Sequence, residues 1–331
     1  MYLYIGWLSI SFLAISTIYL GSIFSSLLNI KNEESSTELT GWQALLMPFT
    51  SSIALMTLFF FFDYVKHIIS SLLMLTSVYS FFIVISILFE KLCVNVRLRN
   101  VCSILFTCAM TIEWMHSGNF VVHNILCSAI CILGISVLKF PNLKVAQYFM
   151  GGLLIYDIYW VFFSSYLFKE NVMVSVATKV STNPLQSAGQ ALGIPLLIAL
   201  KSSMELPIKL IVEVSSEKKL MLGLGDVMIP GMFVCFARKI DTSLSRSAKE
   251  DDEENPREFI EKSLDNENRN SSSSLTYFHG SLLGYTIGLF IAFYVSFSFQ
   301  AAQPALIYLV PGVLLPFYFN AWRRGQFGSN F

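Results

Sequence analysis

Residues 152–163, GLLIYDIYWVFF, place a single carboxylate in the middle of an apolar run. The run extends from residue 145 to residue 168, and about 20 such residues are enough to cross a bilayer as a helix. The nearest basic residues along the chain are Lys144 and Lys169, so no cation close in sequence pairs with Asp157. Because a charge in the hydrocarbon core costs several kcal/mol, an acid at this depth requires a reason.

The composition of the whole chain agrees with a membrane protein. Of the 331 residues, 54% are hydrophobic and only 13% are charged. Soluble domains usually contain about 25% charged residues. We therefore exclude a soluble enzyme, a nucleic-acid-binding protein and a disordered protein. Basic and acidic residues number 22 each, so the net charge indicates no polyanionic partner.

Nine apolar runs are long enough for membrane spans, and we predict an all-α polytopic membrane protein with nine transmembrane helices. The fourth and fifth runs are short, and only the tight turn Ser117-Gly118-Asn119 separates them. The predicted spans are residues 3–29, 43–62, 68–89, 101–118, 119–138, 145–168, 219–238, 275–298 and 304–322.

These spans form one membrane domain, residues 1–331, in three groups. Spans one to five lie within residues 1–138, and spans six and seven lie within 145–238. The last two spans and a tail make up residues 275–331.

Two loops are long: one lies within the second group, between spans six and seven, and the other connects the second group to the third. The loop at 169–218 contains LPIKLIVEV, which is typical of a strand. The loop at 239–274 is acidic and then low in complexity, so we predict that it is disordered. A lumenal N-terminus and a cytosolic C-terminus put 15 of the 22 basic residues in the cytosol, as the positive-inside rule requires.

A second acid, Asp226, lies in residues 221–236, MLGLGDVMIPGMFVCF, within the predicted seventh span. Gly223 and Gly225 flank Leu224, and small residues let a helix or a substrate backbone approach closely. The same pattern is consistent with a glycine-rich packing face whose polar residue is satisfied by a neighbour. The residues around Asp226 alone leave both interpretations open.

Two carboxylates at similar depth on different spans suggest a shared site. If Asp157 and Asp226 face each other, they cannot both ionise, and the pair holds one proton. One carboxylate can then take a proton from water while the other protonates a scissile carbonyl, as in an aspartic protease. Glu113 lies near a span end, and we assign it no role. We predict neither a metal site nor a cofactor.

The third element is the run Gln303-Pro304-Ala305-Leu306, which opens the last predicted span. Proline lacks an N–H group and suits the first turn of a helix, so the run is consistent with simple helix initiation. The functional interpretation is an extended segment that abuts the site of the two acids.

Taken together, three motifs resemble the presenilin and signal peptide peptidase superfamily of intramembrane aspartyl proteases. They are Tyr156-Asp157, Gly223-Leu224-Gly225-Asp226 and Pro304-Ala305-Leu306, on the sixth, seventh and ninth predicted spans. The flanking residues 143–178 and 221–241 are similar to the signal-peptide-peptidase-like branch, nearest its type-three member. The resemblance covers about residues 40–325.

The resemblance implies a presenilin-like fold in which Asp157 and Asp226 are the catalytic pair. It implies that Tyr156 packs beside the site, that the glycine run supports it, and that Pro304-Ala305-Leu306 helps to dock the substrate. The implied substrates are type II single-pass membrane proteins, such as signal-peptide remnants or glycosyltransferase-like anchors, cleaved within the bilayer. The resemblance implies no obligate partner subunit, and a homo-oligomer stays open.

The cellular location and an alternative function complete the expectations from the sequence. The chain ends in RRGQFGSNF without a terminal dilysine, which favours a Golgi membrane over strict residence in the endoplasmic reticulum. The alternative function is a transporter or channel that uses Asp157 and Asp226 as proton or cation sites. Internal repeats would favour a transporter, and the segments around the two acids share no extended pattern.

Overall fold

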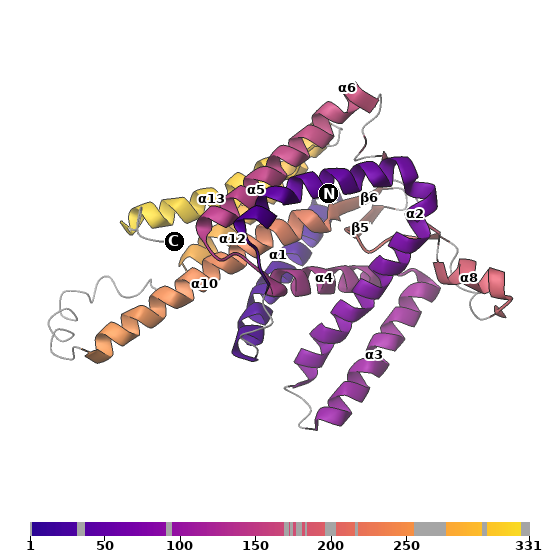
Figure 1. Cartoon of the computed structure of the whole chain (residues 1–331), viewed down its shortest axis with the longest axis horizontal. Helices are drawn as coiled ribbons and strands as arrows, with labels where there is room; N and C mark the ends of the chain where they lie inside the picture. Colours follow the sequence, from indigo (N-terminus) through magenta and orange to yellow (C-terminus); the bar gives the residue numbers. More distant parts are fainter. Residues whose placement is uncertain are drawn as a thin grey trace.

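The computed structural model describes residues 2–31, 37–90, 95–168, 172, 175–176, 181–182, 184–195, 203–215, 218–254, 276–299 and 303–325. The chain is mostly helical (Figure 1). Its helices are α1 (Tyr2–Lys31), α2 (Gly41–Glu90), α3 (Val96–Ser117), α4 (Phe120–Val137), α5 (Leu143–Ile158), the π-helix η1 (Tyr159–Phe163), α6 (Ser164–Phe168), α8 (Pro184–Leu192), α10 (Leu224–Glu254), α12 (Thr276–Phe299) and α13 (Leu306–Arg323). Its strands are β1 (Thr37–Glu38), β2 (Leu138–Lys139), β3 (Ser181–Thr182), β4 (Ser203–Met204), β5 (Lys209–Ser215) and β6 (Lys218–Gly223).

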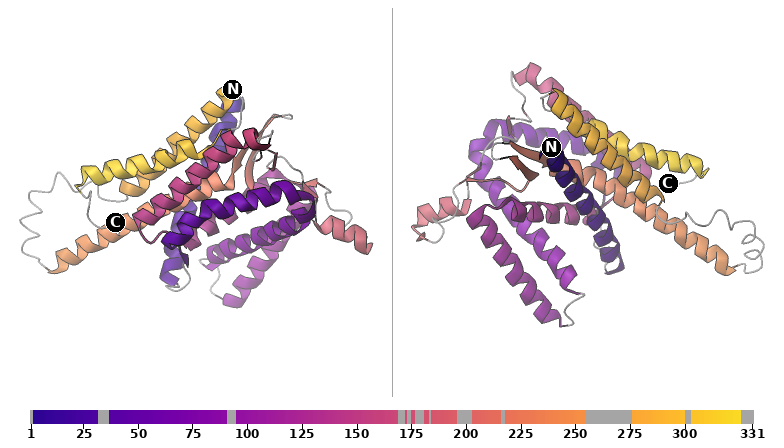
Figure 2. Two further views of the ribbon diagram at one scale, coloured as in Figure 1. Left: turned by 45° about the horizontal axis from the view of Figure 1, so that its top comes forward. Right: turned by 180° about the vertical axis from the view of Figure 1, so that it is seen from behind.

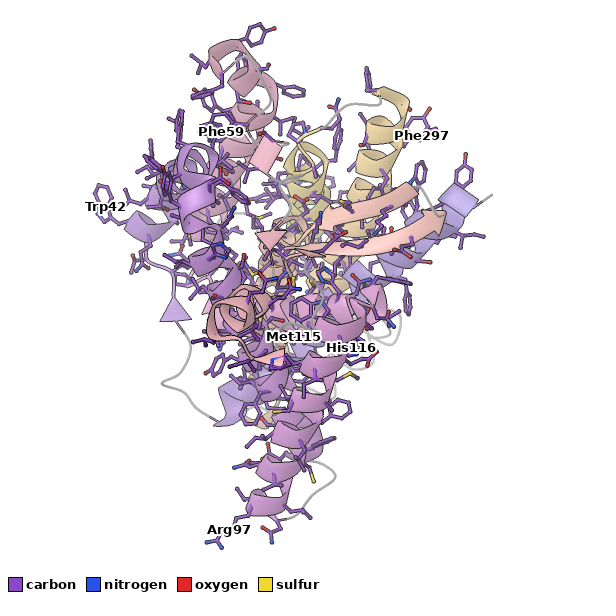
Figure 3. The ribbon with its side chains drawn as sticks, turned by 90° about the vertical axis from the view of Figure 1, so that its right-hand side faces the viewer. Trp42, Phe59, Arg97, Met115, His116 and Phe297 are labelled. Atoms are coloured by element: carbon purple, nitrogen blue, oxygen red, sulfur yellow. The ribbon has the colours of Figure 1, made fainter. Side chains whose placement is uncertain are left out.

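Within the described residues, five helical segments are long and apolar enough to cross a membrane, so the chain is a polytopic membrane protein. Bulky apolar side chains cover much of its surface. Trp42 and Phe297, for example, are 75% and 55% exposed and project outward on opposite sides of the molecule (Figure 3). Such a surface suits lipid rather than water. The number of nine spans remains a prediction.

The second and third predicted spans form one bent helix, which corrects the loop expected between them. Helix α2 runs through this region and departs from helical geometry at Phe61 (φ −112°, ψ 19°). Its direction changes sharply near its middle (Figure 1). Asp63 and Lys66, just after the bend, form an ion pair of 3.3 Å on one helical face. Neither glycine nor proline interrupts residues 49–90, which explains why the helix bends there instead of ending.

The predicted turn between the fourth and fifth spans is confirmed. Helix α3 ends at Ser117, and Gly118 adopts a left-handed conformation (φ 62°), which glycine tolerates without a steric penalty. The Asn119 side chain then accepts a hydrogen bond from the N–H of Val121 and caps α4.

The predicted seventh span starts too early, and its end at residue 238 remains a prediction. Residues 218–223 form strand β6, and the helix begins at Leu224. Helix α10 then continues to Glu254, into the loop predicted to be disordered at 239–274. Alanine, lysine and glutamate after Ser247 are strong helix formers, which explains the extension. Residues 255–275 lie outside the described part of the chain.

Helix α10 lies at the centre of the main bundle and packs against α1, α4, α12 and α13. Small residues bring these helices close together. A Cβ on Gly134 of α4 would lie 2.5 Å from the Met228 sulfur of α10, and one on Gly231 would lie 2.6 Å from Ile135. Figure 2 shows α12 and α13 side by side on one flank of this bundle. The second half of α2 and α3 project from the other flank.

Candidate active site

Asp157 is the penultimate residue of α5 and is buried, with 4% of its surface exposed. The π-helix η1 follows directly, at Tyr159–Phe163. A π-helical turn is rare and often marks a functional site. Trp160 within it donates a hydrogen bond of 3.0 Å to Ser52 of α2, so this turn is attached to a neighbouring helix.

The N-terminus of α13 meets this carboxylate. The N–H of Leu306 donates a hydrogen bond of 3.1 Å to Asp157 Oδ2. The carbonyls of Pro304 and Ala305 accept the first hydrogen bonds of the helix, from Ile307 and from Tyr308. The first N–H groups of a helix have no partner within it, and the positive end of the helix dipole favours a negative charge there. The Pro-Ala-Leu run therefore initiates the helix and also contacts the acid. The expected extended conformation is wrong, because Ala305 has helical geometry (φ −64°, ψ −32°).

Asp226 occupies the first turn of α10. The backbone of Gly223 lies close to its carboxylate. A Cβ on Gly223 would lie only 3.2 Å from Asp226 Oδ2, so a larger residue would crowd the acid. Gly225 is exposed, and a Cβ there would meet only Ile229 at 3.8 Å. The Asp226 carboxylate therefore leaves no room for a larger side chain at residue 223, whereas the space beside Gly225 is open.

The two acids lie close enough for their carboxylates to interact electrostatically. Helices α5, α10 and α13 supply this site, and each contacts the other two. Asp226 is partly exposed, whereas Asp157 is buried. A water molecule or a substrate would therefore reach the pair from the side of Asp226.

The remaining predicted residues surround the pair. Tyr156 is partly buried and packs against a small cluster formed by Leu55, Trp160 and Val172. It lies beside Asp157 in sequence, and its ring is directed toward the α2 side of the site. Leu224 donates its N–H to the carbonyl of Ile208, which ties the start of α10 to the hairpin. Gln303 is partly buried directly before Pro304.

A β-hairpin leads into the site. Strands β5 and β6 pair antiparallel, with Lys209 opposite Gly223, so the hairpin ends three residues before Asp226. The strand predicted within LPIKLIVEV is thus present as β5. Near its other end, Lys219 pairs with Glu213 across the strands at 3.2 Å. This hydrogen bond raises the pKa of the Lys219 ammonium group.

Comparison with known protein families identifies the relatives of this chain. The family described as Signal peptide peptidase matches residues 31–331. The chain belongs to this family. It is therefore an intramembrane aspartic protease of the signal-peptide-peptidase-like kind. Its branch within the family remains a prediction.

Individual relatives agree with this assignment. The chain is 33% identical over 316 residues to Signal peptide peptidase-like 1 of Arabidopsis thaliana, covering 88% of this chain and 81% of the relative. It is 31% identical over 325 residues to the protein of the same name from Oryza sativa subsp. japonica, covering 90% and 83%. It is 28% identical over 211 residues to human Signal peptide peptidase-like 2A, covering 62% of this chain and 33% of the relative.

Two side chains of α4 hold the hairpin of this signal peptide peptidase relative in place. Neither contact was predicted from the sequence. The Asn124 amide of α4 donates to the carbonyl of Ile211 at 2.6 Å and accepts from its N–H at 2.9 Å. His123 Nε2 lies 3.0 Å from the carbonyl of Lys209, and because a carbonyl only accepts, Nε2 is the donor. Both contacts lie on the edge of β5 that faces away from β6. Helix α4 therefore makes the hydrogen bonds that a third strand would make along this edge.

We expect Asn124→Ala to destabilise the protease, because it leaves the N–H and the carbonyl of Ile211 buried without partners. The free energy of unfolding should fall by roughly 1–3 kcal/mol. Thermal unfolding in detergent measures this as a lower midpoint. The matched control is Asn100→Ala, because Asn100 is exposed and lies near the start of α3, whereas Asn124 is on α4. Equal midpoints for the two variants would show that α4 does not hold the hairpin.

Proposed function

We propose that this protease cleaves type II single-pass membrane proteins within the bilayer, with Asp157 and Asp226 as its catalytic pair. The observation that carries the proposal is the hydrogen bond from the start of α13 to Asp157, with Asp226 within electrostatic range of the same carboxylate. Two acids from different helices, one bonded to a backbone N–H and one at a partly exposed position, supply the base and the acid that peptide hydrolysis needs.

The surroundings of the two acids suggest which one acts as the general base and which as the general acid. Both acids lie at a helix N-terminus, and Asp157 in addition accepts a hydrogen bond of 3.1 Å from the Leu306 N–H, which favours its ionised form. It therefore takes a proton from water, and the resulting hydroxide attacks the scissile carbonyl carbon. Asp226 gives its proton to the carbonyl oxygen, which produces a tetrahedral diol. Collapse of the diol breaks the C–N bond, and the leaving nitrogen takes up the proton held by Asp157. One diol hydroxyl returns its proton to Asp226 as the new carboxyl group forms, so both acids regain their starting protonation states.

The hairpin supplies a binding edge for an extended substrate. In the described part of the chain β6 pairs only with β5, and α4 covers the far edge of β5. The outer edge of β6 at Met221, which is 49% exposed, is therefore free to pair with an incoming strand. A peptide paired there would lead its scissile bond past Gly223 and Gly225 toward Asp226.

We further propose a lumenal N-terminus and a cytosolic C-terminus. Contacts among segments predicted on the same side of the membrane support this alternation. Near the predicted lumenal side, Gly6 of α1 lies against Val214 of the hairpin. On the predicted cytosolic side, β1 pairs with β2, and Asp241 of α10 accepts hydrogen bonds from the N–H groups that begin α12, including that of Phe278.

An epitope placed after Phe331 should therefore be digested by protease added outside sealed microsomes. An epitope within residues 184–195 should be protected, because it would face the lumen. Rupturing the microsomes with detergent is the control and should expose both epitopes. The reverse pattern would contradict the proposed orientation and the assignment of the two faces.

We propose a Golgi membrane as the cellular location, on the basis of the resemblance to the type-three signal-peptide-peptidase-like branch. Imaging of a tagged chain against Golgi and endoplasmic reticulum markers tests this. We propose that the chain acts without an obligate partner subunit. Activity of the purified chain would support this, whereas activity only in crude membranes would contradict it.

The proposed function is tested with the purified chain in detergent and a type II membrane protein as substrate. We expect two fragments whose new ends lie within the transmembrane segment, identified by mass spectrometry. Failure to produce fragments from several type II substrates would contradict the proposal. A transporter would instead move ions or protons across reconstituted vesicles and leave the substrate intact.

A further inference from the structure

Tyr285, in the middle of α12, is fully buried, and its hydroxyl has no hydrogen-bond partner in the described part of the chain. Burying a hydroxyl without a partner costs free energy. Phenylalanine would fill the same space with the same ring and without this cost. A buried polar group without a hydrogen-bond partner requires an explanation. Functional sites are where proteins break the rule that buried polar groups are paired.

The packing of α12 directs Tyr285 away from α13. Gly284 and Gly288, four residues apart on one face of α12, lie against the α13 backbone. A Cβ on Gly284 would overlap the carbonyl oxygen of Gly312, and one on Gly288 would lie 2.7 Å from that of Tyr308. The residue after Gly284 is rotated by about 100° around the helix. Tyr285 therefore enters the core on the other side, where α12 packs against α10.

In this core the Tyr285 phenol lies near the candidate catalytic pair. It is close enough to interact electrostatically with the Asp226 carboxylate and with the Cys131 thiol of α4. Cys131 in turn lies 3.8 Å from the carbonyl of Leu224, in the glycine run before Asp226. The hydroxyl is thus enclosed in the core that contains Leu224 and Val227, on either side of Asp226 in the chain, and it has no hydrogen-bond partner among the described residues.

We propose that Tyr285 is a positioning residue of the protease, whose O–H group donates a hydrogen bond to Asp226 as this carboxyl gives its proton to the scissile carbonyl oxygen. The inference rests on the proposed function. Before the transfer Asp226 is neutral and needs no hydrogen-bond donor. This accounts for the unpaired hydroxyl of Tyr285 in the chain without substrate. As the O–H bond of Asp226 breaks, negative charge forms on its carboxylate, and Tyr285 stabilises it while keeping its own proton. An interaction that strengthens only in the transition state raises kcat.

The test is Tyr285→Phe, assayed with the purified full-length chain and the type II substrate described above. We expect kcat to fall roughly ten- to a hundredfold while KM stays within about twofold. The midpoint of thermal unfolding should stay the same or rise, because the change removes an unpaired buried hydroxyl. The matched control is Tyr294→Phe, since Tyr294 lies on the same helix but is 64% exposed. It should leave kcat, KM and the midpoint unchanged.

The outcomes separate this inference from the proposed function. If the wild-type chain cleaves and Tyr285→Phe has a wild-type kcat, the role of Tyr285 is overturned and the proposed function stands. A fall in kcat that comes with a lowered unfolding midpoint would also overturn it, because a structural role would then explain the loss. Absence of cleavage by the wild-type chain would instead refute the proposed function.

Discussion

Asp157→Asn and Asp226→Asn should each reduce cleavage to below about 1% of the wild-type rate, with the protein still folded and inserted. Asparagine keeps the shape of aspartate and its hydrogen-bonding capacity, but it cannot take or give the proton that hydrolysis requires. Folding should survive because a neutral amide costs less to bury than an unpaired carboxylate. Fragment formation from the type II substrate measures activity, and thermal unfolding measures folding.

The double variant should be no worse than either single variant, because each acid is needed in the same reaction and their effects are not additive. Glu113→Gln is the matched control, since Glu113 is also an acid on a predicted span but is exposed. It should retain most of the activity. If Asp157 and Asp226 share a proton, the wild-type rate should follow a bell-shaped pH profile whose two apparent constants belong to the pair. Normal cleavage by either asparagine variant would show that the site is assigned wrongly.

The elements of the site that depend on local chemistry could be predicted from the sequence. Asp157 and Asp226 stand out because an acid in an apolar run has a cost, and proline at residue 304 predicts the start of a helix. The structure places Asp157 against the start of α13 and Asp226 within electrostatic range of it. The sequence could not tell whether glycine at residue 223 spaces helices or leaves room for a carboxylate. Its position against Asp226 supports the second.

Features that depend on distant contacts escaped prediction. Asn124 binds the backbone of Ile211, 87 residues away, and a side chain that pairs with a backbone produces no pattern in either segment. The apolar part of residues 218–223 is only Leu220-Met221-Leu222, and so short a run can be a strand or the start of a helix. It becomes a strand because β5 pairs with it. The orphaned hydroxyl of Tyr285 becomes visible only when its surroundings are known.

The second large effect is expected at the contact between α12 and α13, which supports the Leu306 N–H bonded to Asp157. In a helix, glycine to alanine normally stabilises by up to about 1 kcal/mol. At Gly284 the added methyl group would overlap the carbonyl oxygen of Gly312 and lie 2.7 Å from Pro316. A backbone oxygen cannot rotate away as the end of a side chain can. We therefore expect Gly284→Ala to lower the free energy of unfolding by roughly 1–3 kcal/mol, the usual effect of overpacking.

Activity should fall further than stability alone explains, by about tenfold or more, because small displacements at a catalytic site are costly. Pushing α13 away from α12 moves the Leu306 N–H relative to Asp157, so the carboxylate loses the donor that favours its charge. The matched control is Gly151→Ala on α5, where a Cβ would meet nothing within 4 Å. It should unfold at the wild-type midpoint or above and cleave at the wild-type rate. If Gly284→Ala behaves like this control, the close approach of α12 and α13 does not hold the site together, and the support for Asp157 must come from α5 and η1 alone.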